Sequence, residues 1–211
     1  MALAIMLVAT AAAAAAAAAR VAVLQAQLRA LQEQAVTDPL TGAFNRRQLD
    51  ESLAAAVERR RRTGERASML LLDIDRFKDV NDAFGHAEGD RVLKALVALM
   101  RQRFRKLDRL FRFGGEEFVL LLPGTKFGDA FAVAEELRAL VLDAQLLPDW
   151  HVSISVGVAE LAIEQSPSAW LGDADAALYR AKRAGRNRVA GRLGGSREPS
   201  ASVVAVPVRI S

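Results

Sequence analysis

Two glutamates follow a pair of glycines in residues 112–118, between two apolar runs of the kind found in paired strands. The Gly114-Gly115 connection predicts a tight two-residue turn, because glycine supplies the positive φ angles that such a turn needs. Glycine also lets a flat base or a phosphate lie against the backbone. Since successive strand side chains alternate, Glu116 and Glu117 are expected on opposite faces. The pattern predicts a nucleotide and metal site on a hairpin, although ordinary surface turns have the same composition.

Another carboxylate stands at the end of an unbroken apolar run. This run predicts a strand over Ala67–Ile74 that is buried on both faces. If the strand pairs beside the hairpin, Asp73 and Glu116 converge. Together with the Ile74 carbonyl they would then form a hard oxygen site for Mg²⁺, which substrate phosphates complete. The alternative is a capping or turn aspartate with no ligand.

Composition limits both the metal and the partners. The chain has 211 residues, of which 52% are apolar, enough for one ordinary domain with appendages. It contains no cysteine and only two histidines, His86 and His151, so a metal must be held by oxygen. This favours Mg²⁺, with Mn²⁺ as the alternative. The net charge of +4 comes largely from residues 59–62 and the tail, so it does not indicate a nucleic-acid partner.

A dense polar stretch after Asp73 offers groups that can read a guanine. Asn81 has an amide for the carbonyl edge of the base, and Asp90 has a carboxylate for its ring N–H and amino group. Lys78 is suited to phosphate oxygens. The alternative makes Asp90 the cap of the next helix and Asn81 a turn residue.

Two cations lie one helical turn apart near the end of the chain. Lys182 and Arg186 flank Gly185, which is expected to end a helix. They suit phosphate oxygens, but cations at this end of a helix also suit its dipole without any ligand.

Residues 1–19 carry no charge and a single polar residue, Thr10. As a helix they would span about 28 Å, close to the thickness of a bilayer core. A membrane helix is expected, with a cleaved signal peptide as the alternative. Because Arg20 and Arg29 follow the run and nothing basic precedes it, the rest of the chain is expected in the cytoplasm, at the inner membrane.

Residues 20–36 predict a helix with a short heptad seam made of Leu24, Leu28, Leu31 and Ala35. Such a seam is typical of a dimerising signalling helix. The alternative is an amphipathic helix that packs on its own domain.

Residues 37–190 predict one domain in which helices and strands alternate, followed by a disordered tail over 191–211. The pattern predicts an α/β or α+β sheet covered by helices and preceded by the N-terminal helix. Helices are expected over 46–62, 90–104, 127–144 and 169–184, short helical turns over 77–84, and strands over 67–74, 152–159 and 188–190 beside the two hairpin strands.

Five segments occur in one order along this domain. They are Asp38-Pro39-Leu40-Thr41-Gly42 with Asn45-Arg46-Arg47; Asp73-Ile74-Asp75-Arg76-Phe77-Lys78 with Asn81-Asp82; Phe84-Gly85-His86 with Gly89-Asp90; Gly114-Gly115-Glu116-Glu117-Phe118; and Ala177-Leu178-Tyr179 with Ala181-Lys182 and Gly185-Arg186-Asn187. Together they resemble the GGDEF family of diguanylate cyclases. The likeness covers roughly residues 37–190 and leaves out both ends.

The resemblance implies a polymerase-palm-like, nucleotide-cyclase-like sheet that condenses two GTP molecules into cyclic di-GMP and pyrophosphate. By similarity, Asp73, the Ile74 carbonyl and Glu116 would bind Mg²⁺. Glu116 would also help to deprotonate the attacking 3′-hydroxyl, and Glu117 would assist in the metal and phosphate shell. The residues implied to bind substrate are Asn81 and Asp90 at the guanine with His86 nearby, the Gly114-Gly115 backbone, and Lys78, Lys182 and Arg186 at the phosphates.

Each domain would hold one GTP, so the resemblance implies a homodimer in which two domains face each other. Arg105 and Asp108 are similar to the family's RxxD site for inhibition by the product. Such sites often recruit a second arginine, but this chain has Glu135 and Glu136 where it is expected, and the nearest arginine is Arg138.

Two other functions fit parts of the sequence. One is a catalytically silent receptor for GTP or cyclic di-GMP, which would not need the metal carboxylates Asp73 and Glu116. The other is a cyclase that makes a monomeric cyclic nucleotide, which the Gly-Gly hairpin and the Asn81 and Asp90 pair disfavour.

Overall fold

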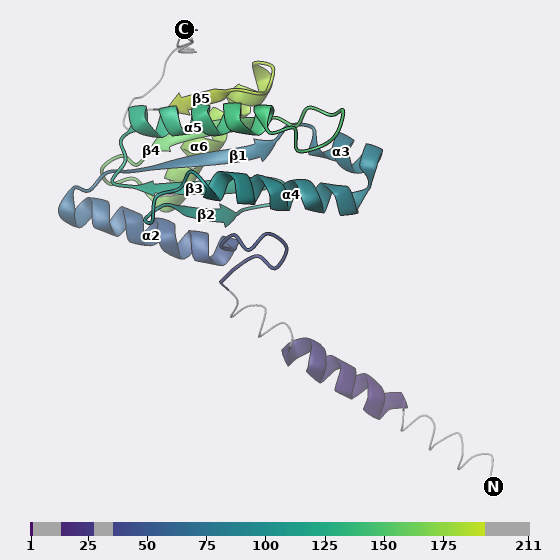
Figure 1. Cartoon of the computed structure of the whole chain (residues 1–211). Coiled ribbons are helices and arrows are strands. Elements are labelled where there is room, and N and C mark those ends of the chain that lie inside the picture. The colour runs from purple at the N-terminus through teal and green to yellow at the C-terminus, as the bar shows by residue number, and fades with distance from the viewer. Residues whose placement is uncertain (2–13, 28–35, 193–211) are drawn as a thin grey trace. The chain divides into compact units, whose positions relative to one another are not determined.

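The computed structural model describes residue 1, residues 14–27 and residues 36–192 of the chain. The chain divides into two compact units, Met1–Val36 and Thr37–Ser211. In the first unit, residues 14–27 form a helix (Figure 1). The side chains of this helix are exposed.

No helix in the described part of the chain is long and apolar enough to cross a membrane. Most of the predicted membrane helix, residues 2–13, lies outside the described residues, and so does the C-terminal tail. Of the heptad seam, Leu24 is described and is 62% exposed, whereas Leu28, Leu31 and Ala35 are not described. The membrane location and the seam therefore stay predictions.

Five strands form one mixed sheet at the centre of the second unit. Their order is β2-β3-β1-β4-β5, and neighbours run antiparallel except for the parallel pair β4 and β5. This confirms the predicted class, an α/β or α+β sheet covered by helices. The strands are β1 (Ala67–Ile74), β2 (Arg109–Arg112), β3 (Glu117–Pro123), β4 (Ile154–Glu160) and β5 (Val189–Arg192).

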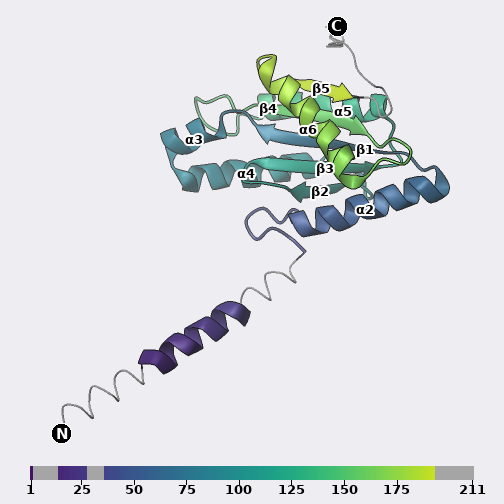
Figure 2. The ribbon, with the colours of Figure 1, turned by 180° about the vertical axis from the view of Figure 1, so that it is seen from behind.

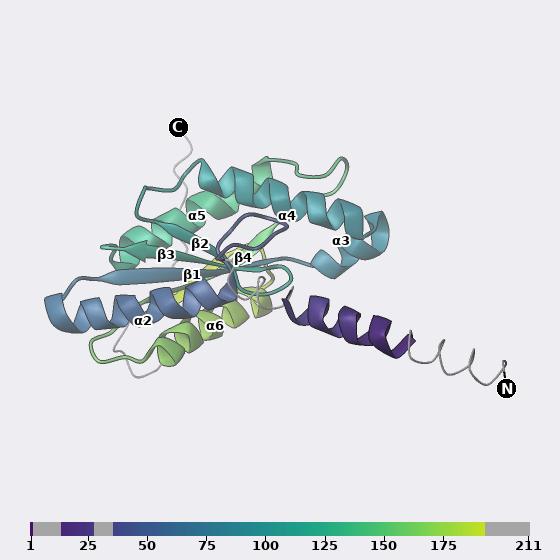
Figure 3. The same cartoon turned by 90° about the horizontal axis from the view of Figure 1, so that it is seen from below.

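Helices cover both faces of this sheet. Helices α4 and α5 lie on one face with α3 beside α4, and α2 and α6 lie on the other face (Figure 1, Figure 2 and Figure 3). Their bounds are α2 (Arg46–Thr63), α3 (Phe77–Phe84), α4 (His86–Arg101), α5 (Phe127–Asp143) and α6 (Pro167–Arg183).

Strand alternation divides the apolar interior into two cores. Leu70 and Leu72 of β1 belong to the core with α4 and α5, whereas Met69 and Leu71 belong to the core with α2 and α6. All eight residues of β1 are buried, as its continuous apolar sequence predicts. By the same alternation Asp73 lies on the α6 side of the sheet.

The corner between α3 and α4 differs from the prediction. Helix α4 begins at His86 rather than near Asp90, and residues 77–84 form a helix of eight residues rather than short turns. The cause is Gly85, which has φ of 83° and forms both the end of α3 and the start of α4. Asp90 therefore lies inside α4 and does not cap it.

Glycine at one position of β4 lets helix α6 lie very close to the sheet. A Cβ atom on Gly157 would lie 2.1 Å from the Ala174 carbonyl oxygen and 2.4 Å from the Leu178 nitrogen. The Trp170 indole N–H fixes the same helix by donating to the Ala159 carbonyl oxygen at 3.0 Å. One turn beyond Leu178, the close approach brings Lys182 to the end of β1.

We predict that Gly157→Ala destabilises the domain by at least about 2 kcal/mol, because the new methyl group meets helix backbone that cannot rotate away. Gly172→Ala on the same helix is the matched control, since a Cβ there meets nothing within 4 Å. The control is expected to be neutral or to stabilise by up to about 1 kcal/mol. Urea unfolding of both variants measures the difference, and equal stabilities would contradict the packing argument.

Candidate active site

Strand β1 pairs with β3 in a register that joins the predicted carboxylates. Asp73 lies directly opposite Glu117. The Ile74 N–H donates to the Glu116 carbonyl oxygen at 3.4 Å. Directly opposed residues of an antiparallel pair share a face and have nearby Cβ atoms, so Asp73 and Glu117 are neighbours. The pairing on which the predicted convergence depends is therefore present.

The Gly-Gly connection is wider than predicted. The N–H groups of Phe113 and Gly114 donate to the Glu117 carbonyl oxygen at 2.8 Å and 3.2 Å, which leaves three residues in the turn. Neither Gly114 nor Gly115 has a positive φ, so the prediction of a tight two-residue turn was wrong. The physical reason is the register: β2 ends where Arg112 pairs with Phe118, and the five residues between them can turn without left-handed backbone.

Gly114 is needed for space rather than for a left-handed backbone conformation. A Cβ on Gly114 would lie 2.6 Å from Glu117 Oε2, whereas one on Gly115 would meet nothing within 4 Å. The expected alternation of the two glutamates does not extend to Glu116, because it lies in the turn before β3 begins. Gly114 therefore leaves room for the carboxylate of Glu117.

Three carboxylates at this end of the sheet have raised pKa values. Burial raises the pKa of Asp73, and the Lys182 ammonium opposes this only in part. Burial also raises the pKa of Glu116, and the charge of Asp73 raises it further. Burial and the same Asp73 charge raise the pKa of Glu117. The three groups therefore repel one another, and a bound cation would relieve this repulsion.

Lys182 supplies the ion pair of the cluster. Its Nζ lies 2.7 Å from Asp73 Oδ2, and the Asp73 side chain is only 8% exposed. The predicted phosphate ligand thus contacts a predicted metal ligand directly. Arg186, the second predicted phosphate ligand, is exposed in the turn after α6, and its charge lowers the pKa of Asp73.

The predicted guanine ligands lie at the corner of α3 and α4. The Asn81 amide packs against Gly89, where a Cβ would lie 2.0 Å from Asn81 Oδ1. Asp90, the next residue, has an exposed side chain, and so do His86 and Lys78. The corner therefore gathers Asn81 and Asp90, and Asp90 remains available because it does not cap the helix.

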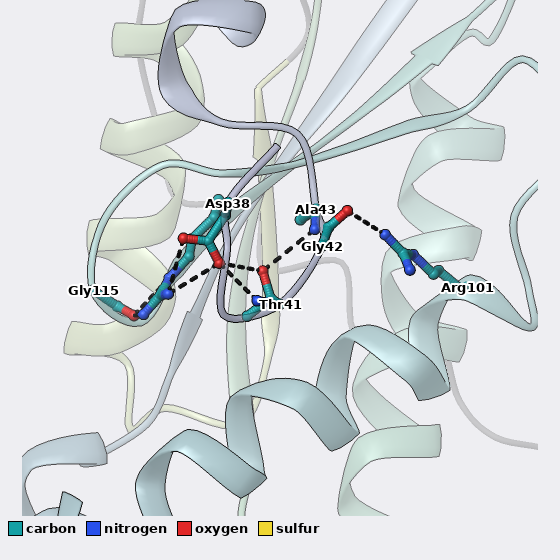
Figure 4. A network of polar contacts seen from close by, with 7 residues as sticks. Asp38, Thr41, Gly42, Ala43, Arg101 and Gly115 are labelled. Carbon is teal, nitrogen blue, oxygen red and sulfur yellow. Dashed lines mark hydrogen bonds and ion pairs between the residues drawn. The ribbon is translucent and has the colours of Figure 1, made fainter. Parts of the chain in front are cut away.

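A polar network attaches the start of the domain to the Gly-Gly turn (Figure 4). The Arg112 guanidinium donates to both Asp38 oxygens, at 3.1 Å and 3.2 Å, and to the Gly115 carbonyl oxygen at 2.7 Å. Asp38 also accepts from the Thr41 N–H at 2.8 Å and from its hydroxyl at 2.6 Å. Burial alone would raise the pKa of Asp38, but the hydrogen bonds from Thr41 and Arg112 outweigh it and lower this pKa.

The same segment lies along the outer strand of the hairpin. The Phe44 N–H donates to the Leu110 carbonyl oxygen at 2.9 Å, and the Phe44 carbonyl accepts from the Arg112 N–H at 2.7 Å. On the other side of the segment, Arg101 Nη2 donates to the Gly42 carbonyl oxygen at 2.5 Å. Residues 37–44 therefore hold the hairpin from outside.

The predicted product site forms a closed turn before β2. Asp108 Oδ2 accepts from the Arg105 N–H at 2.8 Å, and the Asp108 N–H donates to the Arg105 carbonyl oxygen at 3.0 Å. The Arg105 side chain is exposed. Arg138 pairs with Glu135 at 2.9 Å and donates to Asn187 Oδ1 at 2.9 Å, so its guanidinium is already engaged elsewhere.

The carboxylate cluster fits a hard divalent cation in its chemistry. Asp73 and Glu116 offer oxygen donors, and their raised pKa values mark an excess of negative charge. Among the residues that the structure describes, no group of three or more acidic or histidine side chains could hold an ion. The predicted set of Asp73, Glu116 and the Ile74 carbonyl therefore needs further oxygens from a substrate.

Sequence reasoning assigned no chemical role to three residues that the structure places around the site. Arg112 donates to the Gly115 carbonyl oxygen and also to Asp38, which lies 74 positions earlier in the sequence. Asp75 is buried beside the cluster and binds three distant groups. The available signal was their position: Asp38 and Asp75 are charged residues inside the ordered segments, and Arg112 lies two positions before Gly114.

Comparison with known proteins gives one family. A family model described as "Diguanylate cyclase, GGDEF domain" matches residues 35–188. Diguanylate cyclase DgcP of Pseudomonas aeruginosa is 42% identical over 167 residues, which cover 78% of this chain and 25% of DgcP. Response regulator PleD of Caulobacter vibrioides is 42% identical over 166 residues, which cover 76% of this chain and 37% of PleD. The chain thus spans well under two thirds of these curated relatives.

Solved structures share the fold. The coiled coil and GGDEF domain of DgcB from Caulobacter crescentus, in complex with c-di-GMP, matches with a TM-score of 0.73 and 31% identity, over 86% of this chain and 98% of that chain. The active GGEEF domain of a diguanylate cyclase from Vibrio cholerae matches with a TM-score of 0.67 and 36% identity, over 70% of this chain and 96% of that chain. This chain has the same Gly-Gly-Glu-Glu-Phe sequence.

We predict that Glu116→Gln stabilises the domain at pH 7 in the absence of divalent ions. The folded pKa of Glu116 lies above its usual value of 4.5, so the folded state binds the proton more tightly than the unfolded state does. Stability from this group is therefore present at low pH and is lost as pH rises through the usual pKa toward the folded one. Removing the charge should recover about 0.5 to 1 kcal/mol, since Glu116 keeps part of its solvent contact.

Thermal unfolding between pH 4 and pH 7 measures this effect. The gain should shrink as pH falls through the raised folded pKa of Glu116 toward its usual value of 4.5, because the wild-type side chain becomes neutral in the folded state. The exposed Glu136→Gln variant is the control and should change little at any pH. A lower melting temperature for Glu116→Gln at pH 7 would contradict the repulsion argument.

Proposed function

Because this chain belongs to the GGDEF family, we propose that it is a diguanylate cyclase, which condenses two GTP molecules into cyclic di-GMP and two pyrophosphates as a homodimer. The observation that carries the proposal is the cluster at the end of β1, where Asp73 lies opposite Glu117 and the N–H of the next residue, Ile74, donates to the Glu116 carbonyl oxygen. Relatives at 42% identity that bear the name diguanylate cyclase support it.

The proposed reaction makes and breaks one phosphorus–oxygen bond in each of two steps. The 3′-hydroxyl of one GTP loses its proton, and its oxygen bonds to the α-phosphorus of the other GTP. The bond from that phosphorus to the bridging oxygen breaks, and pyrophosphate leaves. The same step in the opposite direction closes the ring.

Glu116 is suited to take the hydroxyl proton. A base works best when its pKa approaches the working pH, and burial together with the Asp73 charge raises the pKa of Glu116 in that direction. Burial also raises the pKa of Glu117, the next residue and the first of β3. Its carboxylate would assist in the shell around the metal and the phosphates.

Asp73, Glu116 and the Ile74 carbonyl are the proposed ligands of Mg²⁺. When bound, this ion would lower the pKa of the attacking hydroxyl and stabilise negative charge on the phosphates. Lys182 contributes a positive charge from the chain itself and would exchange part of its contact with Asp73 for phosphate oxygens.

The substrate position follows from the same end of the sheet. Guanine would bind at the corner of α3 and α4, where Asn81 packs against Gly89 and Asp90 is exposed. The phosphates would extend toward the cluster, where Lys182 and Arg186 add positive charge. His86 and Lys78 are exposed at the start of α4 and of α3.

Two copies are needed because each domain supplies one nucleotide. The helix over residues 14–27 has an exposed surface, and Leu24 of the predicted seam lies on it. The structure of DgcB that contains a coiled coil together with a GGDEF domain supports the proposal that this helix joins two copies.

We predict that the full chain, incubated with GTP and Mg²⁺, forms cyclic di-GMP and pyrophosphate, with a rate per chain that rises with protein concentration. Glu116→Ala should lower the rate at least about 100-fold, since it removes the proposed base and a metal ligand. Glu136→Gln, an exposed glutamate on α5, is the control and should stay within about twofold of the wild type.

Mass spectrometry of the products separates this function from its rivals. A silent receptor would bind nucleotide and leave GTP intact. A monomeric cyclic nucleotide as the product would also contradict the proposal, because one nucleotide would then suffice.

We further propose that the product binds back at the turn of Arg105 and Asp108. This turn is closed by the contact of Asp108 with the Arg105 N–H, which leaves the Arg105 side chain exposed for a guanine or a phosphate. No arginine follows at the expected place on α5, so Arg105 carries most of the affinity.

Calorimetry of cyclic di-GMP binding tests this site. Arg105→Ala should weaken the affinity at least tenfold, about 1.4 kcal/mol. Arg103→Ala, another exposed arginine two positions earlier, is the matched control and should have little effect. Equal affinities of the wild type and Arg105→Ala would end the feedback hypothesis and leave the catalytic proposal standing.

A further inference from the structure

Asp75 is a buried carboxylate that joins three segments of the chain. It follows the last residue of β1 and is 8% exposed. Its Oδ1 accepts from the Ser155 hydroxyl at 2.6 Å, and its Oδ2 accepts from the Ser153 hydroxyl at 2.7 Å. Oδ2 also accepts from the Asn187 backbone N–H at 2.9 Å. Both oxygens are therefore occupied by donors that lie far away in the sequence.

The turn that receives this contact has an unusual backbone. Gly185, Arg186 and Asn187 have φ values of 116°, 63° and 44°. Only the first is a glycine, and left-handed backbone is unfavourable for the other two. Such a conformation persists where surrounding contacts hold it. Here the Asn187 N–H is held by Asp75, and the Asn187 side chain accepts from Arg138 at 2.9 Å.

Arg186 stands in the middle of this turn, and its backbone N–H donates to the Ala181 carbonyl oxygen at 3.2 Å, so the turn is fixed to the last part of α6. The charge of Arg186 is one of those that lower the pKa of Asp73. Lys182, four residues earlier, contacts Asp73 directly at 2.7 Å. The backbone conformation of the turn therefore sets where the Arg186 side chain begins relative to Lys182 and Asp73.

We propose that Asp75 is a positioning residue: by accepting the Asn187 N–H, it holds the turn 185–187, and with it Arg186, at the end of the helix that carries Lys182, where a nucleoside triphosphate would bind. This inference rests on the proposed function for the identity of the ligand. Asp75 itself contacts no ligand in this arrangement, because its oxygens are used within the chain.

Glu160 provides a matched control at the other end of β4. It is a carboxylate of 9% exposure whose Oε2 accepts from a backbone N–H, that of Phe127, at 2.8 Å. Glu160→Ala thus removes the same kind of anchor without touching the turn 185–187. A merely structural effect would appear equally in both variants.

Hydrogen exchange in the full chain without nucleotide tests the anchor itself. In Asp75→Ala, exchange of the Asn187 amide should become at least tenfold faster, with no change at Phe127. In Glu160→Ala the pattern should be reversed. Unchanged exchange at Asn187 would overturn the proposal. If Asp75→Ala fails to fold, Ser155→Ala removes one support of the carboxylate and should still speed exchange at Asn187 about threefold, and no change there would overturn it.

Calorimetry with a non-hydrolysable GTP analogue and Mg²⁺ tests the consequence. Asp75→Ala should weaken binding about tenfold and Glu160→Ala should not. Arg186→Ala should weaken the affinity for the analogue about tenfold when it is introduced into the wild type. Introduced into Asp75→Ala, it should weaken the affinity by less than threefold, because Asp75 acts through Arg186. Asp75→Asn should restore most of the affinity, since its amide oxygen still accepts from the Asn187 N–H.

The outcomes separate this inference from the proposed function. If the double variant loses as much affinity as the two single variants together, the positioning role is overturned. Unchanged affinity in Asp75→Ala would overturn it as well. If the wild type binds no GTP analogue, the proposed function fails and the phosphate part of this inference fails with it. The exchange measurement then still decides whether Asp75 holds the turn.

Discussion

The site depends on the repulsion among carboxylates gathered at the end of β1. Asp73 is almost fully buried, and the glutamates of the hairpin sense its charge through their raised pKa values. Removing charges from water is costly unless they are paired. Lys182 pairs with Asp73 and so balances part of this charge. The fold therefore maintains a local excess of negative charge, which suits a site that has to attract cations together with an anionic substrate.

The rest of the domain keeps these charges in register. Gly157 lets α6 lie against β4, which brings Lys182 to Asp73. Arg112 holds the turn that carries the glutamates, and Asp38 holds Arg112. These supports approach from different elements and from both ends of the domain sequence. Displacing the helix or the segment 37–44 would therefore alter the balance of charge at the same point.

Local sequence patterns predicted which helices and strands the domain contains, but not all of their bounds. The apolar run of β1 gave its bounds, Ala67–Ile74, because a strand buried on both faces needs apolar side chains throughout. The start of α4 was predicted near Asp90 but lies at His86. The polar sequence before Asp90 suggested a longer loop, whereas Gly85 alone forms the corner between α3 and α4. The pairing of Asp38 with Arg112 could not be predicted, because 74 residues separate them and only the folded sheet brings them together.

The segment around Phe44 has a consequence for how copies of the chain can associate. Its backbone bonds to Leu110 and Arg112 use polar groups on the outer side of β2. An outer strand with free groups is a template for pairing with another molecule. Here the Leu110 carbonyl and the Arg112 N–H are already bonded within the chain, so they are not available to a strand of another molecule. Association of two copies across this edge therefore has to use side-chain surfaces, which are easier to regulate and to reverse.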